Sequence, residues 1–535
     1  MKYDSLVYSY PSRRNVVYAK KGMVATSQPM AAQAGLEILQ KGGNAIDAAI
    51  AAAATLTVVE PTSNGIGGDN FALVWVKDKL YGLNSSGKSP KSISIESLKE
   101  RGITEIPKYG FVPVTVPGTP GGWAELSKRF GKLPLAEVLA PAIRYATEGY
   151  CLTPTVAKNW MNTYKIFKAN LKGEEFDNWF KTFAPDGRAP EVGEVWKSPD
   201  HAKTLKLIAQ TNGEAFYKGE LADKIDAFSR KYNGYIRKED LEEFKPEWVE
   251  PISVNYRGYN VWEIPPNGQG VVALMALNIL KNFEFRERDT IDTLHKQIEA
   301  MKLAFADGEK YVADPRMMSV TTKQLLSEEY AKKRSELISK EALMPEAGEP
   351  ASGGTVYLAT ADEEGNMVSL IQSNYYGFGC GIVIPGTGIG LHNRGHNFTL
   401  DPKHDNALAP GKKPYHTIIP GFLSKDGKAV GPFGVMGGFM QPQGHVQVIM
   451  NTIDFHMNPQ DTLDAYRWQW VGENTIQVEP NFPNNLAVQL SQMGHKVVPQ
   501  LDTSSMGRGQ IIWKDENGTL CGGTEPRTDG TIAAW

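Results

Sequence analysis

The sequence has little of what marks specialised protein classes. Only three cysteines occur among 535 residues, at Cys151, Cys380 and Cys521, so neither a disulfide framework nor a cysteine zinc cluster is expected, and a reducing compartment fits. The most apolar run, Ala48–Val59, is shorter than the ~20 residues of a membrane-spanning helix and indicates a buried helix. The start of the chain lacks the apolar core of a signal peptide. We therefore expect a cytoplasmic protein with no membrane partner.

Charge excess and standard catalytic motifs are also lacking. The formal net charge is −3, so nucleic acid is not an expected partner. No G-x-S-x-G, Walker A or H-E-x-x-H pattern occurs. The glycine-rich stretch "GFGCGIVIPGTGIG" does not fit the dinucleotide-binding spacing G-x-G-x-x-G. These absences argue against the best-known hydrolase, nucleotide and zinc sites, and no cofactor is expected.

One group of polar residues could be interpreted as a metal site. Its members are His392, His396, Asp401 and His404. Asn393 and Gly395 lie between the first two and indicate a loop, not the helix face that an i, i+4 histidine pair needs. Ordinary loop histidines are the preferred interpretation, and a metal-dependent hydrolase using His392 and His396 remains an alternative.

Local signals predict helices, then strands, then helices and strands again. Ser27 is expected to cap a first helix that ends at Gly42-Gly43, and Asn44 to cap a second, alanine-rich helix. Residues 120–345 are expected to be mostly helical, with a linker-like composition in residues 341–354. Hairpins are predicted within 355–374, 416–438 and 508–527. This order predicts a layered α+β fold.

The junction at Gly354-Thr355 joins the linker to a strand. If the bond between these residues is cut, Thr355 gains a free α-amine, whose pKa near 7.7–8.0 suits a base for its own hydroxyl. Two glycines, Gly437 and Gly438, could present backbone N–H groups to an oxyanion. A threonine that only begins a strand is the competing interpretation, and the residues alone leave both open.

A resemblance to a known family decides between these two interpretations of Thr355. It rests on a series of stretches that occur in the same order as in that family. They are "GMVATSQPMAAQAGLEILQKGGNAIDAAIAA", "SNGIGGDNF", "VPGTPGGW", "PLAEVLAPAIRYATEGY", "ADGEKYVADP", "GGTVYLATADEEGNMVS", "FGCGIVIPGTGIGLHN", "MGG" and "TEPRTDG". In them the chain resembles the gamma-glutamyltranspeptidase family of N-terminal nucleophile hydrolases, and more specifically its divergent cephalosporin acylase-like branch.

The resemblance implies a four-layer αββα sandwich, formed as one intertwined domain by a large segment, 1–354, and a small catalytic segment, 355–535. It implies a proenzyme that cuts itself between Gly354 and Thr355 into a heterodimer, with further dimerisation left open. The implied substrate is a small-molecule amide or gamma-glutamyl compound, and the implied acyl acceptor is water or an amine.

The resemblance also assigns catalytic roles. Thr355 is the implied nucleophile, although the second threonine that often follows it in the family is Val356 here. Ser373 lies where the family carries a hydroxyl that bonds the amine of the nucleophile. Gly437 and Gly438 match the oxyanion-hole glycines.

The substrate-binding positions depart from the pattern. Ser86 occupies the slot of the arginine that binds the α-carboxylate, and Asn397 that of the acid that binds the α-amine. His416-Thr417 replaces a Ser-Ser pair, and Arg394 is introduced. Because a lost arginine–carboxylate pair is a large change, Arg394 could clamp a different carboxylate, such as that of a glutaryl group, with Lys88 as a weaker candidate.

Two tyrosines, Tyr375 and Tyr376, could line an acyl pocket or simply pack. Taken together, the sequence predicts an autoprocessing threonine amidase or acyltransferase that favours an unidentified amide over glutathione. The alternative is an unprocessed, inactive family member that acts as a binding protein.

Overall fold

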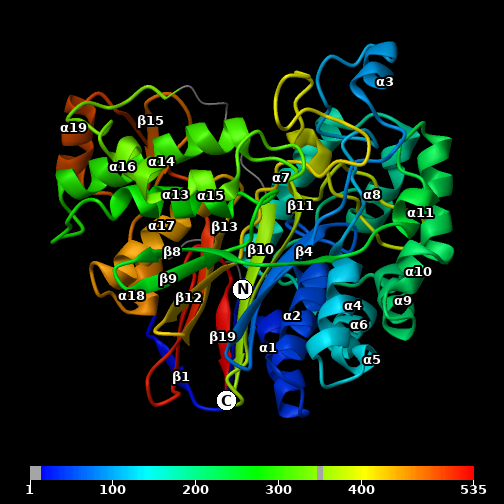
Figure 1. The fold of residues 1–535 in the computed structure, drawn as a ribbon. Helices are drawn as coiled ribbons and strands as arrows, with labels where there is room; N and C mark the ends of the chain where they lie inside the picture. Colours follow the sequence, from blue (N-terminus) through cyan, green and yellow to red (C-terminus); the bar gives the residue numbers. More distant parts are fainter. Residues whose placement is uncertain (1–13, 346–353) are drawn as a thin grey trace.

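Four layers make up the fold. The computed structural model describes residues 14–345 and 354–535, and in it two antiparallel sheets face each other between two layers of helices (Figure 1). The αββα sandwich implied by the resemblance is therefore confirmed. Most of the predicted linker, residues 346–353, lies outside the described residues.

One sheet is built around the strand that starts at Gly354, and we call it the β10 sheet. Its order is β19 (Thr531–Ala534), β2 (Gly22–Thr26), β10 (Gly354–Asp362), β11 (Met367–Tyr375), β3 (Asp69–Val76), β4 (Lys79–Ser85) and β7 (Glu247–Val249).

The other sheet, the β13 sheet, has the order β1 (Val17–Ala19), β18 (Leu520–Thr524), β17 (Arg508–Lys514), β13 (Lys428–Met436), β12 (Gly421–Lys425), β9 (Tyr259–Glu263) and β8 (Ile252–Tyr256). Both sheets combine strands from before and after Thr355. The two segments are therefore interleaved, and their assignment as subunits remains a prediction.

Helices of the first half cover the β10 sheet. They are α1 (Pro29–Gln40), α2 (Ala45–Val59), α4 (Thr119–Phe130), α5 (Leu135–Val138), α6 (Ala140–Glu148), α7 (Pro154–Asn170), α8 (Asp177–Phe183), α9 (Pro199–Gln210), α10 (Glu214–Tyr217), α11 (Glu220–Lys231) and α12 (Lys238–Glu242). The short α3 (Ile95–Glu100) packs in a separate small cluster. A small two-stranded sheet pairs β5 (Tyr150–Cys151) with β6 (Val195–Trp196).

The β13 sheet is covered by α13 (Gly270–Leu280), α14 (Ile291–Tyr311), α15 (Thr322–Leu325), α16 (Glu328–Ser335), α17 (Met440–Ile453), α18 (Pro459–Asp464) and α19 (Asn484–Gln492). A third sheet on this side joins β14 (Trp468–Trp470), β15 (Thr475–Val478) and β16 (Lys496–Pro499). In the described part of the chain no helix is both long and apolar enough to cross a membrane.

The two alanine-rich helices form as predicted, with one correction. Asn44 caps α2 by accepting from the amides of Ile46 and Asp47, and every residue of α2 is buried. Ser27 does not cap α1, because the N-cap is Gln28 and the Ser27 hydroxyl donates to Glu60 Oε2 at 2.5 Å instead. The small side chains let α1 and α2 pack closely, which provides a rigid floor under β10 and β11.

The expectation that residues 120–345 are mostly helical missed three strands. Strands β7, β8 and β9 fall between Glu247 and Glu263 and join both sheets. Their side chains alternate only weakly between buried and exposed. Because a strand at or near a sheet edge has a mixed environment on each face, this segment gives a weak period-2 signal.

Facing strands bring Thr355 and the Gly437-Gly438 pair to the same end of the sandwich. Tyr357 of β10 lies against Gly434 of β13, and Met367, which pairs with Ala361, lies near Gly431. Strands β10 and β13 therefore run in opposite directions across the interface. The start of β10 at Thr355 thus faces the end of β13, where Gly437 follows.

Candidate active site

Thr355 begins a buried, hydrogen-bonded strand. The Thr355 hydroxyl donates to Ser373 Oγ at 3.1 Å. Ser373 Oγ also accepts a hydrogen bond from the Tyr375 amide at 2.8 Å. Thr355 is 1% exposed and Ser373 is fully buried. Opposite them, Gly354 pairs with Tyr375, and a register shift separates Gly354 from Val356. The β10–β11 ladder thus holds the Thr355 hydroxyl against Ser373, whereas the expected bond from Ser373 to the amine of the nucleophile stays a prediction.

The Gly437-Gly438 turn has a backbone that only glycine adopts easily. The φ angle is 138° at Gly437 and 59° at Gly438. Within residues 14–345 and 354–535, neither N–H group donates a hydrogen bond. Buried backbone donors rarely lack an acceptor. Two free N–H groups at the end of β13 are suited to stabilise a negative oxygen near Thr355.

A glutamine connects this turn to the segment that contains Tyr415 and Thr417. Gln269 Nε2 donates to the carbonyls of Gly438 at 2.9 Å and Thr417 at 2.6 Å, while its Oε1 accepts from the Tyr415 hydroxyl at 3.0 Å. Gln269 is fully buried. One side chain therefore fixes the glycine turn relative to the predicted binding residue Thr417.

Arg394 is buried against Tyr375 and Thr417 and does not lie on the surface. Its guanidinium stacks over the Tyr375 ring at 4.4 Å, and Nη1 donates to Thr417 Oγ1 at 2.7 Å. Arg394 is 0% exposed, and its Nε and Nη2 atoms have no hydrogen-bond acceptor among the described residues. Burial lowers the pKa of Arg394 to about 10, although Asp69 opposes the change, so the group is charged at neutral pH.

Asp69 holds the polar groups around Arg394. His416 Nε2 donates to Asp69 Oδ2 at 2.9 Å, His392 Nδ1 lies 3.2 Å from the same oxygen, and Arg394 Nε lies 3.9 Å away. Burial alone would raise the pKa of Asp69, but His392 and His416 outweigh it and hold that pKa below its usual value. Asp69 is therefore ionised, and it orients His416 and Arg394.

Asn397 and the two tyrosines complete the buried wall. The Tyr375 hydroxyl donates to Asn397 Oδ1, and Asn397 Nδ2 donates to the Tyr415 carbonyl at 3.0 Å. The rings of Tyr375 and Tyr376 lie 4.2 Å apart, and both residues are buried. The structure thus brings together Asn397, Tyr375, Arg394 and Thr417, and their predicted role in substrate binding stays a prediction.

Ser86 belongs to a neighbouring network. Its hydroxyl donates to Asn84 Oδ1 at 2.7 Å and accepts from Asn267 Nδ2 at 3.3 Å. Asn267 in turn donates to the Pro414 carbonyl and accepts the His416 amide. Ser86 therefore reaches the predicted binding segment through Asn267, and it forms no hydrogen bond with Arg394 in the described structure.

The histidines considered for a metal point to separate partners. His396 Nδ1 lies 2.7 Å from the Ile106 carbonyl and His404 Nδ1 accepts the Asn406 amide at 2.9 Å, whereas His392 contacts Asp69. They form no metal-ligating group in the part of the chain that the structure describes.

A different set, His295, Glu299 and His495, has ligand atoms within 4.8 Å of one another. A cation is already present there, because Lys302 Nζ donates to Glu299 Oε1 at 2.7 Å and lies 3.4 Å from His495 Nδ1. The ring nitrogens also have protein partners, since His295 Nε2 lies 2.9 Å from the Ser339 carbonyl and its Nδ1 lies 2.9 Å from His495 Nε2. We interpret this cluster as a polar anchor for residues 339–343.

Buried neutral histidines predict loss of stability in acid. Burial lowers the pKa of His201 to about 4. An unfolded histidine binds its proton near pH 6.5, so protonation favours the unfolded chain. The contribution of His201 is complete above about pH 6.5 and falls by about 1.4 kcal/mol per pH unit as the pH approaches 4.

Urea denaturation at pH 7, 6 and 5 checks this expectation. We expect the stability difference between the wild type and His201→Gln to shrink or reverse as the pH falls, because only the wild type carries the titrating ring. A difference that is independent of pH would show that His201 is not held neutral.

Asp69 and Gln269 are the residues that the sequence analysis missed. Asp69 stood inside the quoted stretch "SNGIGGDNF", but nothing in the stretch itself indicates that its carboxylate faces two histidines and an arginine. Gln269 follows a glycine and two prolines, a pattern that indicates only a turn.

Comparison with known proteins gives a consistent result. The sequence profile of the family described as gamma-glutamyltranspeptidase matches residues 31–535. The glutathione hydrolase-like YwrD proenzyme of Bacillus subtilis is 36% identical over 96% of this chain and 98% of its own. The oxamate amidohydrolase proenzyme of Klebsiella pneumoniae is 32% identical with the same coverage. Among solved structures, the cephalosporin acylase from Bacillus halodurans is 65% identical, with a TM-score of 0.98 over 100% of this chain and 99% of that one.

Proposed function

Because the chain belongs to the gamma-glutamyltranspeptidase family, we propose that it is an autoprocessing amidase or acyltransferase whose nucleophile is Thr355. Its relatives are hydrolases, amidohydrolases and acylases, and several are described as proenzymes. One observation carries the proposal: the buried Thr355 hydroxyl bonds to Ser373 at the end of the sandwich where the N–H groups of Gly437 and Gly438 lack acceptors.

The first step is the cut that creates the N-terminus. The Thr355 oxygen adds to the Gly354 carbonyl carbon, the C–N bond breaks, and the proton of the hydroxyl is transferred to the departing nitrogen. Water then hydrolyses the resulting ester, which leaves a carboxylate on Gly354 and a free α-amine on Thr355. In the intact chain Thr355 is 1% exposed, so little external substrate can reach it before the cut.

The second step is acyl transfer. The α-amine of Thr355 accepts the proton of its own hydroxyl while the oxygen attacks the amide carbonyl. The oxyanion lies against the amides of Gly437 and Gly438, and its collapse expels the amine, which takes the proton. An ester on Thr355 remains until water or an amine attacks it. Ser373 positions the nucleophile throughout.

Substrate choice follows from the charges around Thr355. Arg394 offers Nε and Nη2 without acceptors, while Asp69 Oδ2 contacts His392 and His416 and Asp69 Oδ1 has no hydrogen-bond partner among the described residues. This arrangement suits an acyl group with a terminal carboxylate and no ammonium group, such as glutaryl. A gamma-glutamyl head would also bring an ammonium group close to the buried Arg394 charge, and the Asp69 carboxylate, which Arg394 and two histidines already share, offsets that repulsion only in part.

Chromogenic anilides test this assignment. We expect the wild type to hydrolyse glutaryl-p-nitroanilide more efficiently than gamma-glutamyl-p-nitroanilide. In Arg394→Gln the ratio of kcat/KM for glutaryl to neutral butyryl anilide should fall about a hundredfold, because a buried charge-assisted contact is lost. In Arg394→Lys this ratio should fall less, because lysine keeps the positive charge although it lacks the planar guanidinium that can bind both carboxylate oxygens.

The neutral butyryl anilide serves as the control for damage to the fold. Robust turnover of the gamma-glutamyl anilide with a micromolar KM would contradict the preference, and an unchanged glutaryl-to-butyryl ratio would remove Arg394 from recognition.

A further inference from the structure

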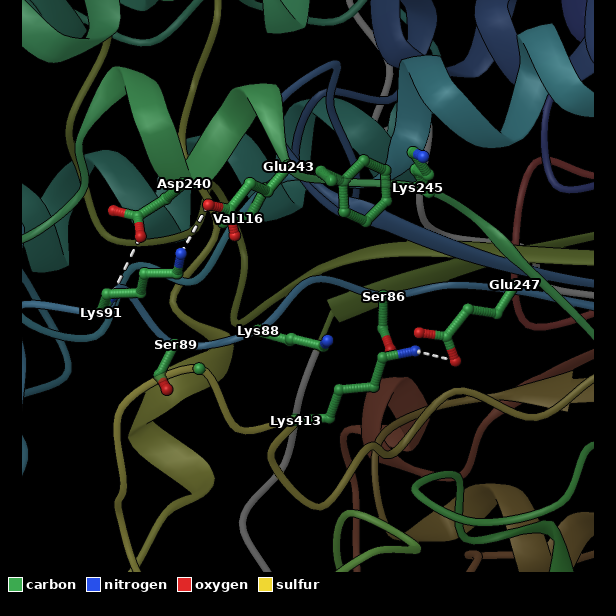
Figure 2. Close-up of a pocket in the computed structure, with 12 residues that line it drawn as sticks. Ser86, Lys88, Ser89, Lys91, Val116, Asp240, Glu243, Lys245, Glu247 and Lys413 are labelled. Carbon is green, nitrogen blue, oxygen red and sulfur yellow. Dashed lines mark hydrogen bonds and ion pairs between the residues drawn. The ribbon is translucent and has the colours of Figure 1, made fainter.

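Two groups of charged side chains outside the mechanism differ in how deeply they are buried. In a pocket of about 270 Å³, Lys91 pairs with Glu243 and Lys413 pairs with Glu247 (Figure 2). Both carboxylates are at least half-exposed, and exposed ion pairs of this kind contribute little. The second group is buried, and we call it the α14 cluster; its members are His295, Glu299, Lys302 and His495.

The α14 cluster joins two parts of the helical layer that covers the β13 sheet. Three of its members are on α14, and His495 is in the loop that follows α19. Helices α14, α16 and α19 lie together in this layer (Figure 1). Each member is at most 3% exposed. Because burying ionisable groups is costly, such a cluster is stable only when its polar atoms are bonded.

The hydrogen bonds of the cluster have one consistent direction. The Ser339 carbonyl can only accept, so His295 Nε2, which lies 2.9 Å away, carries a proton. Burial lowers the pKa of both histidines, which are therefore neutral at pH 7. His295 Nδ1 then accepts from His495 Nε2 at 2.9 Å, and His495 Nδ1 accepts from Lys302 Nζ at 3.4 Å.

The ammonium group of Lys302 uses all three of its donors. Besides His495, it donates to Glu299 Oε1 at 2.7 Å and to the Leu343 carbonyl at 3.1 Å. Glu299 Oε2 accepts the Leu343 amide at 2.9 Å. No polar side-chain atom of the cluster lacks a partner in the described structure. The cluster therefore holds both backbone groups of Leu343 as well as the carbonyl of Ser339.

Residues 339–343, which we call the strap, have little apolar area to bury. The first three residues of the strap are exposed, and the last two are only half-buried. The Ala342 amide donates to the Met493 carbonyl at 2.7 Å. Because the hydrophobic effect scales with the apolar area removed from water, it contributes little to fixing the strap. The bonds to the α14 cluster and to Met493 fix it instead.

The strap lies just ahead of the proposed cut and contacts segments from both sides of it. Leu343 stands twelve residues before Thr355 in the sequence. Met493 and His495 follow Thr355, whereas α14 precedes it. Beyond the cut, pairing of β10 with β11 fixes Thr355 in the sheet. The chain that contains the Gly354–Thr355 bond is thus held at a fixed point on each side.

We propose that the α14 cluster is the upstream anchor of the self-cut, because by fixing Leu343 it keeps the Gly354 carbonyl in the geometry that the Thr355 hydroxyl attacks. The inference rests on the proposed function of Thr355. Members of the cluster are positioning residues, since they contact the strap and not the reacting atoms. Attack requires the oxygen about 3 Å from the carbonyl carbon, and a displacement of about 1 Å can cost a hundredfold in rate. A longer free loop would by itself cost only about twofold.

A matched pair of variants at His295 tests the anchor. His295→Leu removes the hydrogen bond to the Ser339 carbonyl, whereas His295→Gln keeps an amide donor near the place of Nε2. Each full-length chain is synthesised in a cell-free system, and the two fragments are followed on a denaturing gel. We expect the rate of the cut to fall about tenfold in His295→Leu and to stay within about threefold of wild type in His295→Gln. Anilide hydrolysis per mole of processed enzyme should be unchanged in both.

Two variants of the strap separate the anchor from damage to the fold. Ala342→Pro leaves the buried cluster intact but lacks the N–H group that donates to Met493, and it should also slow the cut. Lys340→Gln changes an exposed side chain of the strap and should leave the rate within about twofold. Equal rates in wild type, His295→Leu and Ala342→Pro would overturn the proposal. A cut as slow in His295→Gln as in His295→Leu, or loss of anilide hydrolysis in processed His295→Leu, would also overturn it.

Hydrogen exchange tests the anchor without the cut. In full-length Thr355→Ala, amide exchange in peptides that cover the strap should become about tenfold faster when His295→Leu is added. Exchange that His295→Leu leaves unchanged would overturn the anchor. If the wild type never splits, the proposed function fails, and this measurement still decides whether the α14 cluster holds the strap.

Discussion

Thr355→Ala is expected to remain a single 535-residue chain with no amidase activity above background. The variant lacks the oxygen that attacks Gly354 and later the substrate, so both bond-breaking steps lose their nucleophile. On a denaturing gel the wild type should show two fragments, residues 1–354 and 355–535, and the smaller should begin Thr-Val-Tyr-Leu. Gel mobility, N-terminal sequencing and anilide hydrolysis measure the three outcomes.

The matched control is Thr355→Ser, which keeps a hydroxyl on the same strand. It should still cut and still hydrolyse the anilide, although more slowly, whereas the thermal stability of Thr355→Ala should stay close to that of the intact wild-type chain. If wild-type protein never splits under any condition, Thr355 has no free amine and the chain is better described as an unprocessed binding protein. Cleavage that persists in Thr355→Ala would show that the bond is cut by something other than this threonine.

Gly437→Ala is expected to lower kcat by about 10²–10³ while changing KM little. The φ of 138° at this position is one that a residue with a side chain rarely adopts, and an added Cβ would lie 3.1 Å from Gly507 Cα and 3.4 Å from Met440 Cβ. The turn must therefore shift, which moves the N–H groups away from the developing oxyanion. Because the oxyanion forms only during the reaction, the loss should appear in kcat.

Processing provides a second readout of the same change. The cut at Gly354 develops a negative oxygen as well, so Gly437→Ala should also slow the appearance of the two fragments. Rates are then compared per mole of processed enzyme, determined by titration of the acylated fragment. Gly390→Ala is the control, since an added Cβ there meets no atom within 4 Å. Full activity in Gly437→Ala would remove this turn from the oxyanion site.

The local chemistry of the reactive strand could be predicted from the sequence. The change from a Pro/Ala/Gly run to a β-branched run at Thr355 marks the start of β10, and the hairpin with β11 follows from the short turn between them. The cap at Asn44 is similarly local, because it depends on residues within one helical turn. Such signals can be read from neighbouring residues.

The capping of α1 shows where local signals fail. Ser27 has a suitable side chain beside a proline, yet its hydroxyl donates to Glu60, which lies 33 residues away in sequence. The sequence offers both partners, and only the packing of α1 against α2 decides between them. Strand β7 was missed for a related reason, because its partner β4 lies far away in the sequence, whereas β8 and β9 form a local hairpin whose alternation of buried and exposed side chains is weak.

By itself the sequence determined the family, and by resemblance it predicted Thr355 as the nucleophile and the loss of the charges expected for a gamma-glutamyl head, because each is written in contiguous residues. The tertiary structure decided the rest of the site. Asp69 meets His416 across 347 positions, and Arg394 meets Thr417 across 23. Lys413, which follows Thr355 in the sequence, lines the same pocket as Ser86, which precedes it. These contacts depend on how two interleaved sheets bring distant segments together, since a buried charge finds its partner through packing and not through its neighbours in sequence.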